Sequence, residues 1–235
     1  EGSVIWDEDN PGNYSFDPGE DFQDLMQDEP RDITFTYQVN DGTDLSNEAT
    51  ITVAITGSDD ETTVIDGTLT GVVEDGPAVS NSFPDPTDAD DGDTYTYEII
   101  ENTLEGSAII NGSGGYTFDP GGDFQDLMQN EPRYVTFTYR SLNQNSIPVP
   151  SINNATITIT VTGTNDIAEV NDADLPGVVE DGPAVTGTVP VPTDADDGDT
   201  YTYTTVSEPN EGSVIWDEDN PGNYSFDPGE DFQDL

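Results

Sequence analysis

The sequence predicts an all-β protein made of tandem β-sandwiches of about 105 residues each. Three observations predict this fold. Long segments repeat along the chain, apolar and polar residues alternate with a period of two, and clusters of Gly, Asp, Asn and Pro separate the alternating segments. The alternation gives each strand one face toward a core, and the turn clusters keep the strands short. About seven such strands fill each repeat, as in a β-sandwich.

The repeats define the domain organisation. The repeated blocks are residues 1–25 with 105–127 and 211–235, 71–97 with 177–203, and 49–60 with 155–166. The first and last of the three related segments are identical and the middle one is diverged, which predicts two alternating types of repeat. We therefore predict that 1–60 is the C-terminal half of one β-sandwich repeat, that 61–166 is a complete repeat, and that 167–235 is the N-terminal portion of the next. We expect a neighbouring copy or further chain to complete each terminal piece, since a half sandwich leaves open sheet edges.

The strands of the complete repeat follow from local patterns. Thr94–Ile99, Val135–Tyr139 and Ala155–Val161 alternate apolar and polar residues, which predicts strands with threonine toward water and Ile, Val and aromatic residues inward. Glu74–Pro77 and Asn111–Gly115 have the composition of turns. No segment predicts a long helix.

One short segment outside the strands carries apolar residues at helical spacing. Asp123–Gln129 predicts a single helical turn, with Phe124 and Leu127 packing under the sandwich.

The charge of the chain excludes several functions. There are 51 Asp and Glu residues against 3 Lys and Arg, a formal net charge of −48. Binding to nucleic acid or to an anionic membrane surface needs a basic patch, which this composition lacks. No apolar run is long enough to insert into a membrane. With no Cys and no His, thiol chemistry, ordinary zinc sites and Ser-His-Asp triads are excluded. Folding at this charge predicts a need for bound cations.

Carboxylates cluster at three kinds of place, each present twice. The motif TDADDGDT places four carboxylates around a glycine turn just before a strand. Hard cations, Ca²⁺ above all, take six to eight oxygen ligands from such loops. The sequence therefore predicts calcium sites. The candidate ligands are Asp88, Asp90, Asp91 and Asp93 with Asp194, Asp196, Asp197 and Asp199 in these loops, Glu74 and Asp75 with Glu180 and Asp181, and, at the repeat junctions, Asp59 and Asp60 with Asn165 and Asp166.

These motifs resemble a known group of proteins. The elements GTND, VEDG, TDADDGDTYTY, YTFDP and NATITITVTGTND, in this order, resemble the cadherin-like and VCBS-type repeats of giant bacterial RTX adhesins, over essentially the whole chain. The resemblance implies Ig-like, cadherin-like Greek-key sandwiches with Ca²⁺ bound at or near the domain boundaries. By this resemblance the ligands are Glu74, Asp88, Asp90, Asn165 and Asp166, and at the matching positions Glu180, Asp194, Asp196, Asp59 and Asp60.

The complete repeat departs from the simpler pattern at one turn. Arg140–Ser151 replaces the short turn Val39–Gly42 of the first piece. We therefore expect any ligand at Asp41 to have no counterpart in the complete repeat.

The function predicted from these features is structural. We expect an extender region of a large cell-surface adhesin or extracellular filament, in which Ca²⁺ at the junctions makes the array rigid and the partners are neighbouring repeats or identical chains. An enzyme is not expected. A glycosidase pair needs one carboxyl in an apolar cleft, whereas these carboxylates lie in charged turns that are duplicated along the chain.

Two alternatives remain open from the sequence. One is a self-assembling, S-layer-like surface filament of a halophile, in which chains complete one another's sandwiches and the acidic residues form a hydrated surface. The other is a glycan-binding surface module that uses Trp6 and Trp216. In either case the protein is expected outside the cell.

Overall fold

The structure, a computed structural model, is all-β, which confirms the predicted fold class. It describes residues 1–88, 90, 92–112, 114–143 and 149–232, and within these ranges all regular secondary structure is β. No helix in the described residues could therefore span a membrane. The strands are β1 (Ser3–Trp6), β2 (Tyr14–Asp17), β3 (Pro30–Tyr37), β4 (Ala49–Thr56), β5 (Gly67–Val73), β6 (Val79–Ser82), β7 (Tyr95–Glu101), β8 (Ser107–Asn111), β9 (Gly115–Asp119), β10 (Pro132–Asn143), β11 (Val149–Pro150), β12 (Ala155–Thr162), β13 (Val185–Thr188), β14 (Ser213–Trp216) and β15 (Asn223–Asp227).

The chain packs as two compact units. The first comprises residues 1–70, 78–119 and 134–160, and the second comprises 71–77, 120–133 and 161–235. The predicted complete repeat, 61–166, contributes to both units. Its two loops around 71–77 and 120–133 pack with the segment that follows the repeat in the sequence. Each junction between repeats therefore lies inside a single unit.

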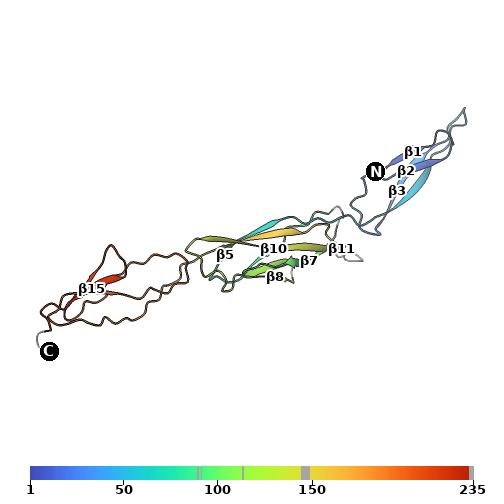
Figure 1. The fold of residues 1–235 in the computed structure, drawn as a ribbon. Helices are drawn as coiled ribbons and strands as arrows, with labels where there is room; N and C mark the ends of the chain where they lie inside the picture. Colours follow the sequence, from blue (N-terminus) through green and yellow to red (C-terminus); the bar gives the residue numbers. More distant parts are fainter. Residues whose placement is uncertain (89, 91, 113, 144–148, 233–235) are drawn as a thin grey trace. The chain divides into compact units, whose positions relative to one another are not determined.

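Strands β5 to β12 form two sheets. One has the strand order β11-β10-β12-β5, with β7 also paired to β10, and the other has the order β6-β9-β8 (Figure 1). Aromatic rings from both sheets meet between them. The ring of Phe83 lies 5.0 Å from that of Tyr116 in β9 and 4.5 Å from that of Tyr139 in β10. All three side chains are buried, so this region is a β-sandwich with an aromatic core.

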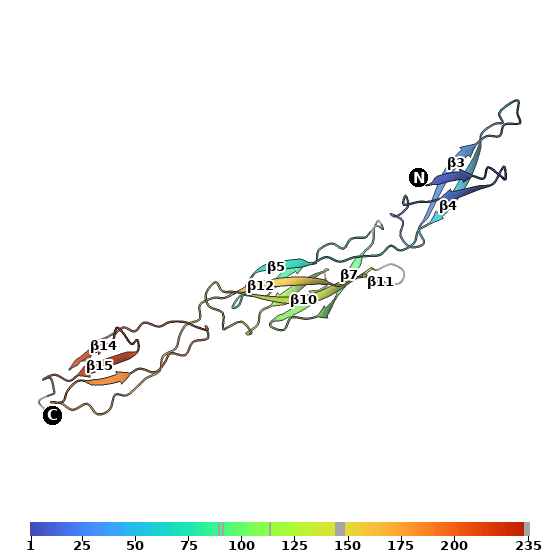
Figure 2. The same cartoon turned by 45° about the horizontal axis from the view of Figure 1, so that its top comes forward.

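Strand β12 shows how the period of two builds this core. Ala155, Ile157, Ile159 and Val161 are each at most 3% exposed, and the threonines between them are partly exposed. Figure 2 shows this strand between β5 and β10. The predicted alternation in this strand is confirmed. Because four apolar side chains leave water on one face, burial of this strand supplies several kcal/mol, at about 1.5–3 kcal/mol for each large residue.

Residues 1–56 form two two-stranded sheets, β1-β2 and β3-β4. Their rings gather in one cluster, in which Trp6 lies 5.5 Å from Tyr14 and 6.2 Å from Tyr37. These three residues are 46%, 41% and 36% exposed, respectively. In the complete repeat the equivalents of Tyr14 and Tyr37 are Tyr116 and Tyr139, and both are fully buried. The first segment thus has the inner face of a sandwich without its cover.

The second unit contains the three-stranded sheet β13-β15-β14. The indole of Trp216 in β14 stacks on Tyr203 at 5.8 Å and donates a hydrogen bond of 2.9 Å to the Thr205 hydroxyl. Packing against rings in this way is typical of core residues. The sequence prediction that Trp6 and Trp216 bind glycans gains no support from it.

The two types of repeat place an aromatic ring at different positions in the sequence. In the complete repeat Tyr97 stacks on Phe83 at 4.3 Å, and Ile110 stands on the opposite sheet. In the next repeat the residue equivalent to Phe83 is Val189, and the residue equivalent to Ile110 is Trp216. A large ring and a small aliphatic side chain have therefore exchanged places. We call this pair of substitutions the ring exchange.

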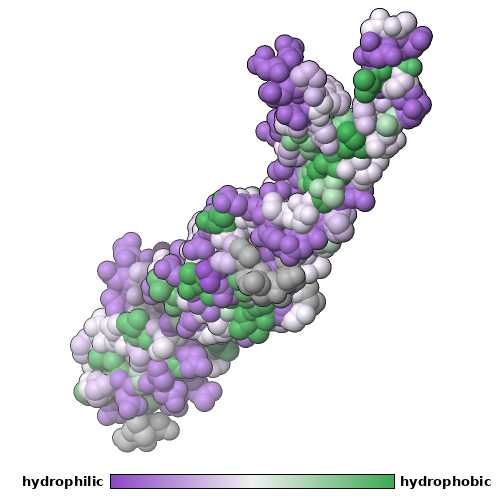
Figure 3. Space-filling model, turned by 90° about the vertical axis from the view of Figure 1, so that its right-hand side faces the viewer, coloured by the Kyte–Doolittle hydropathy of each residue, from purple (hydrophilic) through white to green (hydrophobic). Residues whose placement is uncertain are grey.

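The segment predicted as a helical turn, Asp123–Gln129, forms hydrogen-bonded turns and no helix. The Leu127 amide donates to the Phe124 carbonyl at 3.1 Å, and both side chains are buried as expected. On the face of the molecule in Figure 3, hydrophilic residues predominate and apolar residues form separate patches, as the acidic composition requires.

Candidate metal centres

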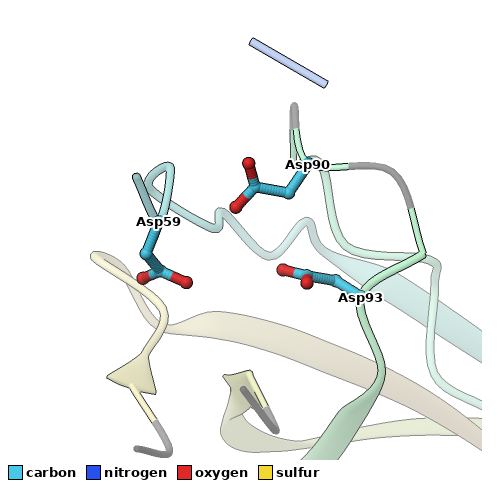
Figure 4. A group of neighbouring side chains, drawn as sticks. All are labelled: Asp59, Asp90 and Asp93. Carbon is cyan, nitrogen blue, oxygen red and sulfur yellow. The ribbon is translucent and has the colours of Figure 1, made fainter. Parts of the chain in front are cut away.

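Three carboxylates meet at the junction before the complete repeat, and we call them the first cluster. Asp59 comes from the segment between β4 and β5, and Asp90 and Asp93 come from the loop that precedes β7. One carboxylate oxygen from each residue lies within 4.8 Å of the others. In Figure 4 the three side chains point toward a common space.

Hydrogen bonds fix the loop that presents Asp90. The Asp60 backbone N–H donates to Asp90 Oδ2 at 3.0 Å, and the Asp90 N–H donates to Asp88 Oδ1 at 3.2 Å. The Thr62 hydroxyl donates to the other oxygen of Asp88. Asp60 and Asp88 thus orient the loop and add negative charge, although neither belongs to the group of three.

The electrostatics of Asp90 favour a bound cation. Its side chain is 7% exposed, and its Oδ1 has no hydrogen-bond partner in the described part of the chain. Burial, reinforced by the charges of Asp88 and Asp93, raises the pKa of Asp90 to about 6. Buried charges in proteins are normally paired or bound to metal. A cation in this space would offset the desolvation and the repulsion together.

None of the protein's own cations serves this purpose, because all three arginines are engaged elsewhere. Each pairs with a carboxylate outside the three-residue groups, which keeps those carboxylates ionised by lowering the pKa of Asp24 and Asp126. The pairs are Arg31 with Asp24 at 2.5 Å, Arg133 with Asp126 at 2.5 Å, and Arg140 with Glu98.

A second, similar cluster lies at the next junction. It consists of Asp194, Asp196 and Asp199, whose carboxylate oxygens again lie within 4.8 Å of one another. The Asp166 N–H donates to Asp196 Oδ2 at 3.0 Å, and the Asp196 N–H donates to Asp194 Oδ1 at 3.2 Å. Asp196 is 5% exposed, and its Oδ1 lacks a partner among the described residues. The hydrogen-bonded loop thus recurs, but this group contains Asp194, the equivalent of Asp88, and no residue equivalent to Asp59.

Glu74 and Asp75 join the second junction from the far end of the complete repeat. Glu74 is 1% exposed, and its Oε1 accepts hydrogen bonds from the Thr164 N–H at 2.5 Å and the Thr164 hydroxyl at 3.0 Å. Its Oε2 is buried without a partner in the described structure. Burial, with the charges of Asp75 and Asp196, raises the pKa of Asp166. Three separate acidic motifs therefore meet at this junction.

Other predicted ligands lie outside these groups. Asn165 is exposed and donates to the Asp166 carbonyl at 2.5 Å. Asp197 is also exposed, and its backbone N–H donates to the Asp126 carbonyl at 3.1 Å. Glu180 and Asp181 are exposed and belong to neither group of three. Asp91 lies outside the described residues.

Sequence reasoning missed Asn143. This side chain is 1% exposed, and its amide nitrogen donates to Asp59 at 3.2 Å and to Asp93. Counted from the shared motif TFTY, Asn143 occupies the position of Asp41 in the first segment. In the structure β10 ends at Asn143 and carries its side chain into the cluster, whereas Asp41 lies in an exposed turn after β3, so the expectation about a ligand at Asp41 stays a prediction. Aligning the two repeats on TFTY could have revealed Asn143.

The first and second clusters fit calcium. Two oxygens bound to one ion at about 2.4 Å are at most about 4.8 Å apart, so the separations within each group of three are compatible with one shared Ca²⁺. Hard oxygen donors without nitrogen or sulfur also favour Ca²⁺ over transition metals. At the second junction, the free oxygens of Glu74 and Asp166 supply further ligands of the same kind.

Comparison with known proteins identifies the fold. No protein-family model matches the chain, and no curated protein matches it. Solved structures do. Mouse Cadherin-23 EC22-24 is 18% identical with a TM-score of 0.59, and the match covers 97% of this chain and 72% of that one. Mouse Protocadherin-24 EC1-3 is 16% identical with a TM-score of 0.53, over 97% and 73%. The Protocadherin GammaB4 extracellular domain is 16% identical with a TM-score of 0.52, and this chain spans 39% of its length. The chain therefore has the fold of cadherin extracellular domains.

Proposed function

We propose that this chain is part of a calcium-stiffened extender, an array of extracellular repeats that holds an adhesive region away from a cell surface. The observation that carries the proposal is the repeated cluster. At both junctions three carboxylates converge, and a buried oxygen of the central aspartate, Asp90 or Asp196, lacks a hydrogen-bond partner in the described structure. Repetition of the cluster at the junctions supports a mechanical role.

Calcium would act by joining the junction to the repeat. Asp59 lies in the connecting segment, whereas Asp90 and Asp93 lie in a loop of the following repeat. Without a cation these carboxylates repel one another, which favours a looser junction. A divalent ion held by all three removes the repulsion and restrains the connecting segment against the loop.

The cadherin-like fold and the resemblance to bacterial RTX adhesin repeats support an extracellular, surface-attached setting. In repeat arrays, stability is approximately the sum of repeat and interface terms. Each junction that binds calcium therefore adds its own increment of rigidity and stability. The predicted division into repeats at 60 and 166 places one cluster at each boundary.

Thermal unfolding of the full chain in concentrated NaCl, with CaCl₂ or with a chelator, tests the proposal. Concentrated salt screens general repulsion, so any further stabilisation by Ca²⁺ comes from specific sites. We expect a higher melting temperature with Ca²⁺, equivalent to about 2.7 kcal/mol per site when calcium is present at 100 times its dissociation constant. Equal melting temperatures with and without Ca²⁺ would mean that the acidic residues serve only as a hydrated surface.

A second candidate function is assembly of identical chains. The rings of Trp6, Tyr14 and Tyr37 form an exposed face, whereas in the complete repeat Phe83 and Tyr97 cover the matching rings. We infer that a second copy of the chain can cover this face with its segment 185–206, which contains the equivalents of those two residues.

Sedimentation velocity at increasing protein concentration tests the second candidate. We expect larger species at high concentration and their loss in the Tyr14→Asp variant, because a charge on this face prevents close packing. The matched control is Tyr134→Asp, which alters a residue that is 66% exposed on β10. A chain that stays monomeric throughout the concentration series would exclude this mode of assembly.

A further inference from the structure

The position of Asn143 distinguishes the first cluster from a purely acidic site, and the inference drawn from it rests on the proposed calcium function. Asn143 lies at the end of β10, 1% exposed, with its amide nitrogen directed at Asp59 and Asp93. Its amide is a neutral group placed among these carboxylates. An amide side chain can interact in two ways, because its nitrogen donates hydrogen bonds and its oxygen accepts them.

The two repeat types differ in charge at this position. The first segment carries Asp41 where the complete repeat carries Asn143, four residues after the shared motif TFTY. The substitution removes one negative charge and keeps a side-chain oxygen at the same branch point. In the structure Asn143 is the last residue of β10, whereas Asp41 follows the end of β3 in an exposed turn, where its Oδ1 accepts hydrogen bonds from the Thr43 and Asp44 N–H groups.

We propose that Asn143 is a calcium ligand of the first cluster and sets its affinity. Without the ion, its amide nitrogen donates to Asp59 and Asp93 and partly neutralises them. When the ion binds, the amide turns so that its Oδ1 faces the metal. The fully buried position gives the amide no water to turn toward instead.

A separate observation points to a ligand in this space. Asp90 is more than nine-tenths buried, its carboxylate points into the cluster, and its Oδ1 has no partner in the described residues (Figure 4). Asn143 donates to the other two carboxylates of the group, not to this oxygen. The amide therefore relieves part of the repulsion and leaves a position for a cation beside Asp90.

The consequence is a site with weaker calcium binding and a more stable ion-free state than an aspartate would give. Calcium affinity in protein loops rises with the number of charged ligands. Asn143 lowers that number by one, and its donated hydrogen bonds favour the ion-free form that calcium must displace. Junctions of this type should therefore release calcium first as its concentration falls.

The test is calorimetric titration of the full chain with CaCl₂. A background carrying Asp194→Asn and Asp196→Asn removes the second cluster, so that the heat reports the first. In this background we expect Asn143→Asp to bind Ca²⁺ at least tenfold more tightly and to melt at a lower temperature in chelator. The matched control, Asn81→Asp, adds the same charge to an exposed residue of β6 and should change neither quantity.

A second variant separates a ligand from a mere counter-charge and covers the case in which Asn143→Asp fails to fold. Asn143→Ala removes both the amide nitrogen and Oδ1. If Asn143 is a ligand, calcium binding weakens. If the amide only neutralises the ion-free cluster, calcium binding tightens, and the proposal is overturned. Equal affinities for all three proteins overturn it too, and the proposed function survives. If the background chain with Asn143 and its variants bind no Ca²⁺ at all, the proposed function itself fails at this junction.

Discussion

Calcium binding at the first junction is expected to disappear in a chain that carries Asp88→Ala together with Asp90→Ala. Asp90 contributes the buried oxygen that lacks a partner in the described structure, and Asp88 accepts the hydrogen bonds that shape its loop. Both the ligand and its support are therefore lost. In thermal unfolding, the free energy of stabilisation by calcium should be smaller by about 2.7 kcal/mol than in the wild-type chain, when calcium is at 100 times the wild-type dissociation constant. Calorimetric titration should show that the second cluster still binds.

The chain offers a closely matched control for this variant. Asp172 and Asp174 have the same D-x-D spacing and the same charge, but both are exposed and belong to neither cluster. Asp172→Ala with Asp174→Ala should therefore leave the calcium response unchanged. If both double variants lost the same amount of calcium stabilisation, the effect would come from net charge, and the assignment of the first cluster would be wrong.

The largest effect on folding is expected from Phe83→Ala, which should lower the free energy of unfolding of its sandwich by about 3–5 kcal/mol. Phe83 is 4% exposed and lies within 5.0 Å, centroid to centroid, of the rings of Tyr97, Tyr116 and Tyr139. Removing it leaves a cavity where rings from both sheets meet. Urea denaturation followed by tyrosine fluorescence or circular dichroism measures the loss.

Leu104→Ala is the control for apolar truncation, because Leu104 is 100% exposed. Its effect should stay within about 0.5 kcal/mol, as for most surface substitutions. A similar small effect of Phe83→Ala would show that the two sheets do not share this aromatic core in solution.

Much of the fold could be predicted from the sequence because the physical signals were local. The alternation of Ala155–Val161 is a property of one strand, and it directly identifies the buried face. The same holds for the acidic loops, in which a glycine turn places neighbouring carboxylates together. The helical turn at Asp123–Gln129 was wrong because three-residue spacing of Phe124 and Leu127 also suits consecutive tight turns.

The candidate sites could be predicted only in part because they are assembled over long distances in the chain. Asn143 reaches Asp59 across 84 residues, and Thr164 reaches Glu74 across 90. No local pattern carries that information. The replacement of a short turn by Arg140–Ser151 also hid the register of β10, which only the sheet pairing reveals.

The ring exchange also matters for how such an array folds without error. Tandem repeats of similar sequence are prone to domain swapping, in which one repeat takes a strand from its neighbour during synthesis. Here nearest neighbours are of different types. A hybrid that joins the Phe83 segment to a strand bearing Trp216 is overfilled, at a cost of about 1–3 kcal/mol. The reverse hybrid, Val189 with Ile110, leaves a void instead. Alternation of the two repeat types therefore makes the most frequent misassembly the least stable one, and each newly made repeat is directed to its own strands.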